Sequence, residues 1–122
     1  MKAIGVDIIE IERIQLMTDK YGLRFLCKIY TERELDYCRL SDGSYRVNSL
    51  AARFAAKEAF YKAANQVVKQ TIPWHDCEII NKKNGTPQIC LNSHTKSELR
   101  ETTIHLSLSH CHQYAVAFVV ID

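Results

Sequence analysis

The sequence contains no apolar run that approaches the roughly 18 residues of a membrane-spanning helix. Its first residues, Met1 to Ile4, do not open the long apolar segment of a secretory signal peptide. The 5 cysteines are scattered and no two form a C-x-x-C pair, which disfavours a disulfide framework and a cysteine-rich zinc site. We therefore expect a soluble, cytosolic (cytoplasmic) protein with reduced thiols.

A large net charge is also absent. The 16 basic and 14 acidic residues leave a formal charge of +2, which argues against nucleic acid held mainly through its phosphates and gives no sign of attraction to a membrane. No P-loop, Rossmann fingerprint or nucleophile elbow is present. The 122 residues, 47% of them hydrophobic, contain no repeat or linker, so we expect a single domain over residues 1–122.

The first half of the chain has mainly helical patterns. Residues 3–11 are an exception, because their valines and isoleucines favour a mostly buried strand. Helical spacing follows from residue 12 to about residue 40, with a break at Tyr21-Gly22 and a capping box that joins Thr31 to Glu34. A long helix is predicted from Leu50 to about residue 65, with Asn48 or Ser49 as its N-cap.

The second half is mainly extended. It predicts a hairpin of residues 77–81 and 88–92 around an Asn84-Gly85 turn, a short helix over 93–101, and strands over 104–109 and 115–121. This order indicates an α+β fold with a largely antiparallel sheet packed against a long helix and short helices. We expect the first strand to join the last two.

The long helix is the most informative segment. At about 100° per residue, alanines share a face that permits close packing against a sheet: Ala52, Ala56, Ala59 and Ala63. Charged residues lie in the opposite sector: Arg53, Lys57, Glu58 and Lys62. Glu58 follows Phe54 by one turn and is flanked by apolar side chains, so we expect its carboxylate to need a partner.

Two interpretations of the acidic residues Asp7 and Glu58 stay open. Glu58 could form an ordinary ion pair with Lys62, four residues on, of a few tenths of a kcal/mol, and Asp7 could bind backbone amides or cap the next helix. Alternatively, the two carboxylates could hold Mg²⁺, which accepts one or two carboxylates when phosphate oxygens and water complete its octahedron. The second interpretation indicates phosphate chemistry.

The segment 104–110 alternates between apolar and polar residues. Its polar face carries His105, Ser107 and Ser109, and this is either the exposed face of a half-buried strand or a catalytic surface. The sequence His110-Cys111-His112 is weak evidence for a transition metal because no further spaced ligands accompany it. Hydroxyls and imidazoles suit phosphate contacts better.

Two segments, residues 5–14 (GVDIIEIERI) and 53–63 (RFAAKEAFYKA), together closely resemble the bacterial holo-acyl-carrier-protein synthases, the small class of phosphopantetheinyl transferases. The likeness covers nearly the whole chain, because residues 25–38, the turn at 84–87 and the segment 105–110 also follow in the expected order. The resemblance implies transfer of 4′-phosphopantetheine from coenzyme A to a serine of apo acyl carrier protein, in fatty acid biosynthesis. It also implies Mg²⁺ and a homotrimer with active sites between subunits.

The resemblance further implies roles for individual residues. Asp7 and Glu58 match the metal-binding carboxylates, and Lys62 matches the lysine near the transferred phosphate; these three are the expected catalytic residues. Coenzyme A is expected near three more side chains: Arg53, His105 and His110. Two arginines match positions that face the acidic carrier protein: Arg13 and Arg24. Glu58, a metal-bound water or a histidine could each accept the serine proton.

Two positions depart from the wider family. Larger relatives carry a second acidic ligand two residues after the aspartate, where this chain has Ile9, and Glu10 has the wrong strand parity to replace it. Residues 64–68 also lack the glycine-bearing turn of many relatives. The alternative hypothesis, from a different functional class, is a noncatalytic module that binds an anionic ligand through the positive sector of the long helix.

Overall fold

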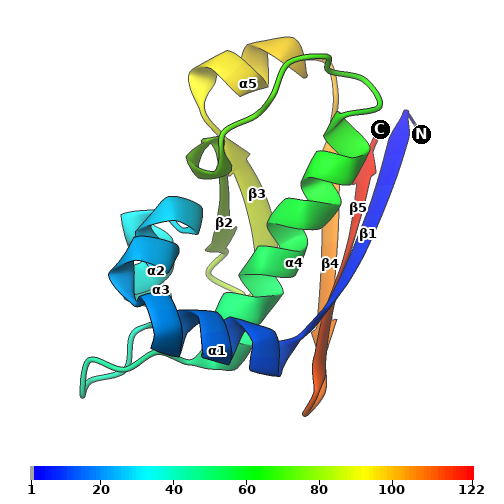
Figure 1. The fold of residues 1–122 in the computed structure, drawn as a ribbon. Coiled ribbons are helices and arrows are strands. Elements are labelled where there is room, and N and C mark those ends of the chain that lie inside the picture. Colours follow the sequence, from blue (N-terminus) through cyan, green and yellow to red (C-terminus); the bar gives the residue numbers. More distant parts are fainter. Residues whose placement is uncertain (1) are drawn as a thin grey trace.

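The computed structural model describes residues 2–122 and has the expected α+β architecture. Strands β1 (Ala3–Glu10), β4 (Ile104–His110) and β5 (Tyr114–Ile121) form an antiparallel sheet in the order β1-β5-β4. Helix α4 (Val47–Ala64) runs along one face of this sheet (Figure 1). The first strand therefore joins the last two, as predicted.

The hairpin forms a second sheet of its own. Strands β2 (Cys77–Asn81) and β3 (Pro87–Leu91) pair only with each other among the described residues, and Gly85 in their turn has φ of 87°. A 3₁₀ turn (Trp74–Asp76) precedes β2, and α5 (Ser93–Glu98) follows β3. In place of the one largely antiparallel sheet that was predicted, the structure has two antiparallel sheets, which adjoin each other along β3 and β4 (Figure 1).

Three short helices occupy the region that precedes α4: α1 (Ile11–Tyr21), α2 (Leu23–Ile29) and α3 (Glu32–Cys38). Gly22 separates the first two with φ of 55°, which confirms the predicted break. The capping box is also confirmed, because the Thr31 hydroxyl accepts from the Glu34 amide while the Glu34 carboxylate accepts from the Thr31 amide.

The predicted N-cap of the long helix is wrong. Helix α4 begins at Val47, and the amides of Ser49 and Leu50 both donate to the carbonyl of Arg46. Arg46 is therefore the N-cap residue, and within residues 2–122 no side chain caps this end. Arg46 is tied to α3 at this point: its amide donates to the Cys38 carbonyl, and its guanidinium donates to the Tyr37 carbonyl and lies over the Tyr37 ring.

Helix α4 packs unusually close to β1. The four alanines of the predicted face are buried, and opposite them Gly5 lies so close that an added Cβ would be 2.0 Å from the Ala59 carbonyl oxygen. Only glycine fits there, since the neighbour is backbone and not a flexible side chain. This contact brings the middle of β1 against the second half of α4, which is where the carboxylates lie.

In the described part of the chain, none of the helices combines the length and apolarity that crossing a membrane requires.

Candidate active site

The crossing of β1 and α4 brings Asp7, Glu58 and Lys62 together. Lys62 Nζ lies 3.1 Å from Asp7 Oδ1 and donates to the Val6 carbonyl at 3.0 Å. The Asp7 side chain is 15% exposed and the Lys62 side chain 54% exposed. In this ion pair the carboxylate is therefore mostly buried and the lysine side chain is open to solvent. Residues 55 positions apart in sequence thus meet at one open site.

Glu58 lies one turn before Lys62 on α4 and is half-buried. Partial burial raises the pKa of the Glu58 carboxyl above its ordinary value, the negative charge of Asp7 raises it further, and Lys62 opposes both effects. Two carboxylates in mutual repulsion, with one cation shared between them, form a site that gains from a further positive charge.

Both simple interpretations of these acidic residues are wrong. Lys62 pairs with Asp7 across the β1–α4 crossing, and within residues 2–122 Glu58 forms no ion pair with it. Asp7 does not cap α1, whose N-cap is Glu10. The reason is geometric, because the close β1–α4 approach at Gly5 places Asp7 nearer to the Lys62 ammonium than the helical spacing alone suggests.

The charged sector of α4 is largely buried, which corrects the expectation of a positive surface. Lys57 is 0% exposed and Arg53 is 4% exposed. Lys57 forms an ion pair with Glu34, at 3.0 Å from Nζ to Oε1. Only Lys62 of the three cations is exposed, so the noncatalytic module loses the surface on which it depended.

Arg53 nevertheless borders a cavity. Its guanidinium donates to the Asn81 side chain and lies 4.1 Å from the Tyr37 ring centroid, while its Nε has no hydrogen-bond partner among the described residues. The cavity, of about 410 Å³, is also lined by three other cations: Arg33, Lys82 and Lys83. Sequence reasoning missed the two lysines, although they directly precede the predicted Asn84-Gly85 turn.

His105 lies away from the Asp7 site. His105 is exposed, and the register pairs it with Val120, whereas Asp7 pairs with Ala117. Because side chains alternate along strands, His105 and Asp7 lie on opposite faces of the sheet. His110 ends β4 and is exposed. The structure therefore does not bring His105 to the Asp7 and Glu58 carboxylates of its own chain.

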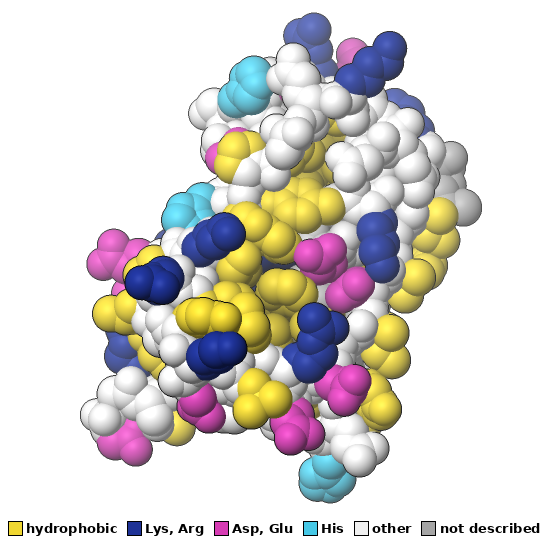
Figure 2. Space-filling model, in the orientation of Figure 1, with side chains coloured by type: hydrophobic (Ala, Val, Ile, Leu, Met, Phe, Trp, Pro, Cys, Tyr) yellow, Lys and Arg dark blue, Asp and Glu magenta, His cyan; other side chains and the backbone are white. Residues whose placement is uncertain are grey.

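Arg13 on α1 and Arg24 on α2 are both exposed. Their helices also expose large hydrophobic side chains: Leu16, Met17 and Leu23. On the face shown in Figure 2, hydrophobic side chains gather in front of α4 and are flanked by both basic and acidic side chains. This surface is mixed in character, apolar with a charged margin of both signs.

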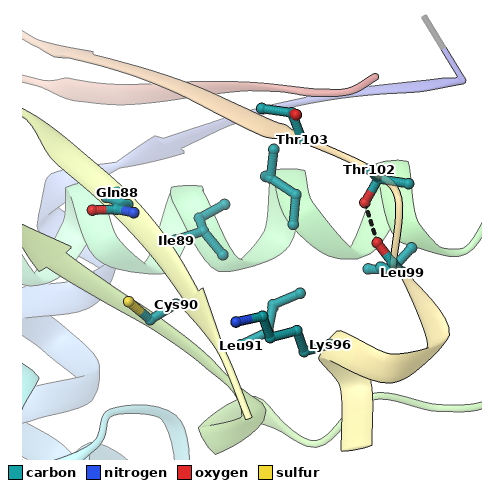
Figure 3. A pocket seen from close by; sticks show the side chains of 9 residues that line it. Gln88, Ile89, Cys90, Leu91, Lys96, Leu99, Thr102 and Thr103 are labelled. Atoms are coloured by element: carbon teal, nitrogen blue, oxygen red, sulfur yellow. Dashed lines mark hydrogen bonds between the residues drawn. The ribbon is translucent and has the colours of Figure 1, made fainter. Parts of the chain in front are cut away.

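A further cavity of about 360 Å³ lies between β3, α5 and β4 (Figure 3). Its lining is mainly apolar or uncharged, with Lys96 as the one charged residue in the lining, and none of Asp7, Glu58 and Lys62 lines it. It therefore lacks the acidic and basic groups of the β1–α4 crossing.

Comparison with known proteins identifies the family of this chain. A family model described as the 4′-phosphopantetheinyl transferase superfamily matches residues 3–119, and the chain belongs to this superfamily. Within it, the chain is 44% identical to the holo-[acyl-carrier-protein] synthase of Protochlamydia amoebophila, over 96% of this chain and 94% of that protein.

Solved structures of holo-[acyl-carrier-protein] synthases share the fold. The Helicobacter pylori protein, in complex with coenzyme A, has a TM-score of 0.85 and 28% identity, over 98% of this chain and 99% of that chain. The Bacillus anthracis protein, in complex with coenzyme A (3′,5′-ADP), has a TM-score of 0.77 and 35% identity, over 98% and 95%.

Proposed function

We propose that this protein has holo-[acyl-carrier-protein] synthase activity: it transfers 4′-phosphopantetheine from coenzyme A to a serine of apo acyl carrier protein, in fatty acid biosynthesis in the cytoplasm. The observation that carries the proposal is the Asp7–Lys62 ion pair beside the half-buried Glu58, in a chain 44% identical to a synthase over nearly its whole length. The serine oxygen bonds to the phosphorus that bears pantetheine, the bond between that phosphorus and the bridging pyrophosphate oxygen breaks, and adenosine 3′,5′-bisphosphate leaves.

The residues at the crossing fit Mg²⁺. Two carboxylates match the one or two that Mg²⁺ accepts in proteins when phosphate oxygens and water supply its other ligands, and the negative charges of Asp7 and Glu58 lie close enough to repel each other. Asp7 and Glu58 would hold the ion. When bound, it would neutralise charge on the pyrophosphate of coenzyme A.

Lys62 and Glu58 supply the remaining chemistry in this proposal. The exposed Lys62 ammonium faces solvent beside Asp7, from where it would stabilise negative charge on the transferred phosphate. The proton of the attacking serine needs an acceptor, and Glu58 is our choice because its half-buried carboxylate lies within the site, one turn before Lys62. Arg53 would bind phosphate of coenzyme A from the cationic cavity.

We propose that the active unit is a homotrimer with sites between subunits. The sheet face opposite α4 is exposed and apolar, with Ile4, Val6 and Ile8 on β1 and Tyr114 and Phe118 on β5. A second copy that covered this face would bury these side chains. His105 lies on the same face, so His105, together with His110 at the end of β4, would contact coenzyme A held by a neighbouring copy.

The acidic carrier protein would dock on α1 and α2. Arg13 and Arg24 are exposed there next to Met17 and Leu23, which provides charge complementarity around an apolar contact. Replacing both arginines with serine should raise the KM for the carrier and leave the affinity for coenzyme A unchanged.

The function is tested by incubating the purified protein with several apo carriers, coenzyme A and Mg²⁺, and measuring the mass of each carrier. The expected result is the mass increase of one phosphopantetheinyl group, lost in Glu58→Gln and on removal of Mg²⁺ with a chelator. Hydrolysis of coenzyme A without carrier modification would indicate a hydrolase, and no reaction with any carrier would refute the proposal.

The assembly is tested by native mass measurement of the wild type and of Phe118→Asp. We expect trimers for the wild type, and inactive monomers for the variant because its carboxylate would be buried in the interface. A fully active wild-type monomer would refute the intersubunit site.

A further inference from the structure

The buried charges Lys57 and Glu34 have no part in the chemistry proposed above. Both side chains are 0% exposed. Lysine and glutamate are almost never fully buried unless they are paired, and a buried pair contributes little net stability. The pair therefore calls for an explanation other than stability.

Each charge binds backbone groups of other segments as well as its partner. Lys57 Nζ donates to the carbonyls of Trp74 and Cys77 in addition to Glu34. The Glu34 carboxylate accepts from the Thr31 amide and, at 2.8 Å, from the Ile79 amide. The network thus joins α4 to α3, to the 3₁₀ turn and to β2.

The backbone groups of β2 that bind Lys57 and Glu34 lie on the edge of the strand that has no neighbouring strand among the described residues. Strand β2 has β3 on one side only. In an antiparallel pair, residues two apart direct their amide and carbonyl to the same side, so the Cys77 carbonyl and the Ile79 amide both face the edge that β3 leaves open. Lys57 and Glu34 satisfy this edge as a neighbouring strand would, and they join α4 to it.

On its other side, α4 meets the three-stranded sheet through small residues. Ala52, Ala56, Ala59 and Ala63 are buried there, and the Gly5 contact sets how closely the helix approaches β1. A side chain that extends about 6 Å from the axis moves about 1 Å for each 10° of rotation. Glu58 directly follows Lys57, so the direction of Glu58 depends on where Lys57 is held.

We propose that Lys57 is a positioning residue for the transfer reaction: its ion pair with Glu34 and its bonds to the edge of β2 set the rotation of α4, and thereby direct Glu58 and Lys62 toward Asp7. This inference rests on the proposed roles of those three residues. Lys57 would affect the rate by fixing where Glu58 and Lys62 lie, without contacting a substrate itself. A misplacement of about 1 Å at a reacting group can cost up to about 100-fold in rate.

The test uses the double variant Lys57→Met/Glu34→Gln, which removes both charges and keeps unbranched side chains of similar length. Its matched control is Leu99→Ala, which removes a buried side chain at the cavity of Figure 3, outside α3, α4 and β2. Three quantities are measured for the full chain: the unfolding temperature, the affinity for Mn²⁺ by calorimetry without substrates, and kcat and KM with apo carrier.

We expect the double variant to bind Mn²⁺ at least about tenfold more weakly and to lose at least about tenfold in kcat, with KM for the carrier unchanged, as for a misplacement well under 1 Å. Leu99→Ala should keep the kcat and the Mn²⁺ affinity of the wild type, although its unfolding temperature should be equal to or lower than that of the double variant. Equal losses in both variants, or wild-type values in the double variant, would overturn the proposal.

If the double variant does not fold, the same measurements on Glu34→Gln decide the question, because this variant keeps the side-chain shape and acceptor oxygen while loosening the hold on Lys57. A smaller loss in kcat and Mn²⁺ affinity supports the proposal, and wild-type values overturn it. If the variant binds Mn²⁺ more weakly as expected but the wild type modifies no carrier, the proposed function is refuted and the positioning role of Lys57 is not. A wild type that neither binds Mn²⁺ nor modifies a carrier would overturn both.

Discussion

Replacing Gly5 with alanine should disable the site without touching any of its charged groups. The new Cβ would lie 2.0 Å from the Ala59 carbonyl oxygen and 2.9 Å from the Ala63 amide nitrogen. An ordinary contact begins at 3.4 Å, so the first distance must increase by 3.4 − 2.0 = 1.4 Å. Both neighbours are backbone atoms of a regular helix, so β1 and α4 must separate by about 1 Å.

This separation of β1 from α4 would occur next to the residues of the proposed chemistry. Asp7 lies two residues beyond Gly5 on β1, and Lys62 is adjacent to Ala63 on α4. Their 3.1 Å ion pair would lengthen beyond hydrogen-bonding distance. A displacement of about 1 Å at reacting groups can reduce the rate by up to about 100-fold, and the overpacked interface should cost about 1–3 kcal/mol of stability.

Carrier modification followed by mass spectrometry and thermal unfolding test this prediction together. Gly43→Ala is the matched control, because Gly43 has φ of 88° with no atom within 4 Å of an added Cβ. It should cost stability through its backbone conformation while keeping kcat. Ala59→Gly should not rescue Gly5→Ala, since the clash is with a carbonyl. Wild-type kcat and unfolding temperature in Gly5→Ala would refute the packing argument.

Three further predictions concern local groups. Thr31→Ala should lower the free energy of unfolding by about 1 kcal/mol in urea titrations because it removes the N-cap of α3; an unchanged midpoint would contradict the cap assignment. In the metal-free protein, Asp7→Asn should lower the pKa of Glu58 by removing a like charge, and Lys62→Met should raise it by removing the compensating cation; NMR titration of the Glu58 carboxyl checks both signs. Backbone hydrogen bonds lower the pKa of the exposed Cys111 thiol, whereas burial raises that of Cys77 to about 12, so iodoacetamide at neutral pH should modify Cys111 and leave Cys77 intact. Peptide mapping that found Cys77 alkylated in the folded chain would show that this thiol is not buried.

Elements with local signals were predictable because their causes lie within a few residues. The capping box at Thr31 and Glu34, the break at Gly22 and the hairpin turn at Gly85 each depend on near neighbours, and the structure confirms all three. Hydrophobic periodicity likewise located the strands of both sheets. The N-cap of α4 was missed because no side chain among the described residues caps this end, and Arg46 is instead tied to α3 through the carbonyls of Tyr37 and Cys38, which are contacts outside α4.

The residues of the candidate site could be predicted from the sequence, but the ion pairs that they form could not. The residue pattern and the family resemblance singled out Asp7, Glu58 and Lys62. The pairing of Lys62 with Asp7, in place of Glu58, depends on how closely β1 approaches α4. The partner of Lys57 was equally hidden, since Glu34 already had a local explanation as part of the capping box.

Sequence alone was sufficient for the class of fold and for the long helix with its alanine face. These depend on residue type and on periods of two or 3.6 residues, which a chain expresses without long-range contacts. The acidic and basic residues that carry the proposed chemistry were assigned through the resemblance to a known family. Tertiary packing decided which of the charged side chains are buried and which partners they contact. The three cations and one carboxylate in the charged sector of α4 could have shared one solvated surface, but α4 packs against strands of both sheets, so Lys57 and Arg53 are buried while Glu58 and Lys62 meet Asp7.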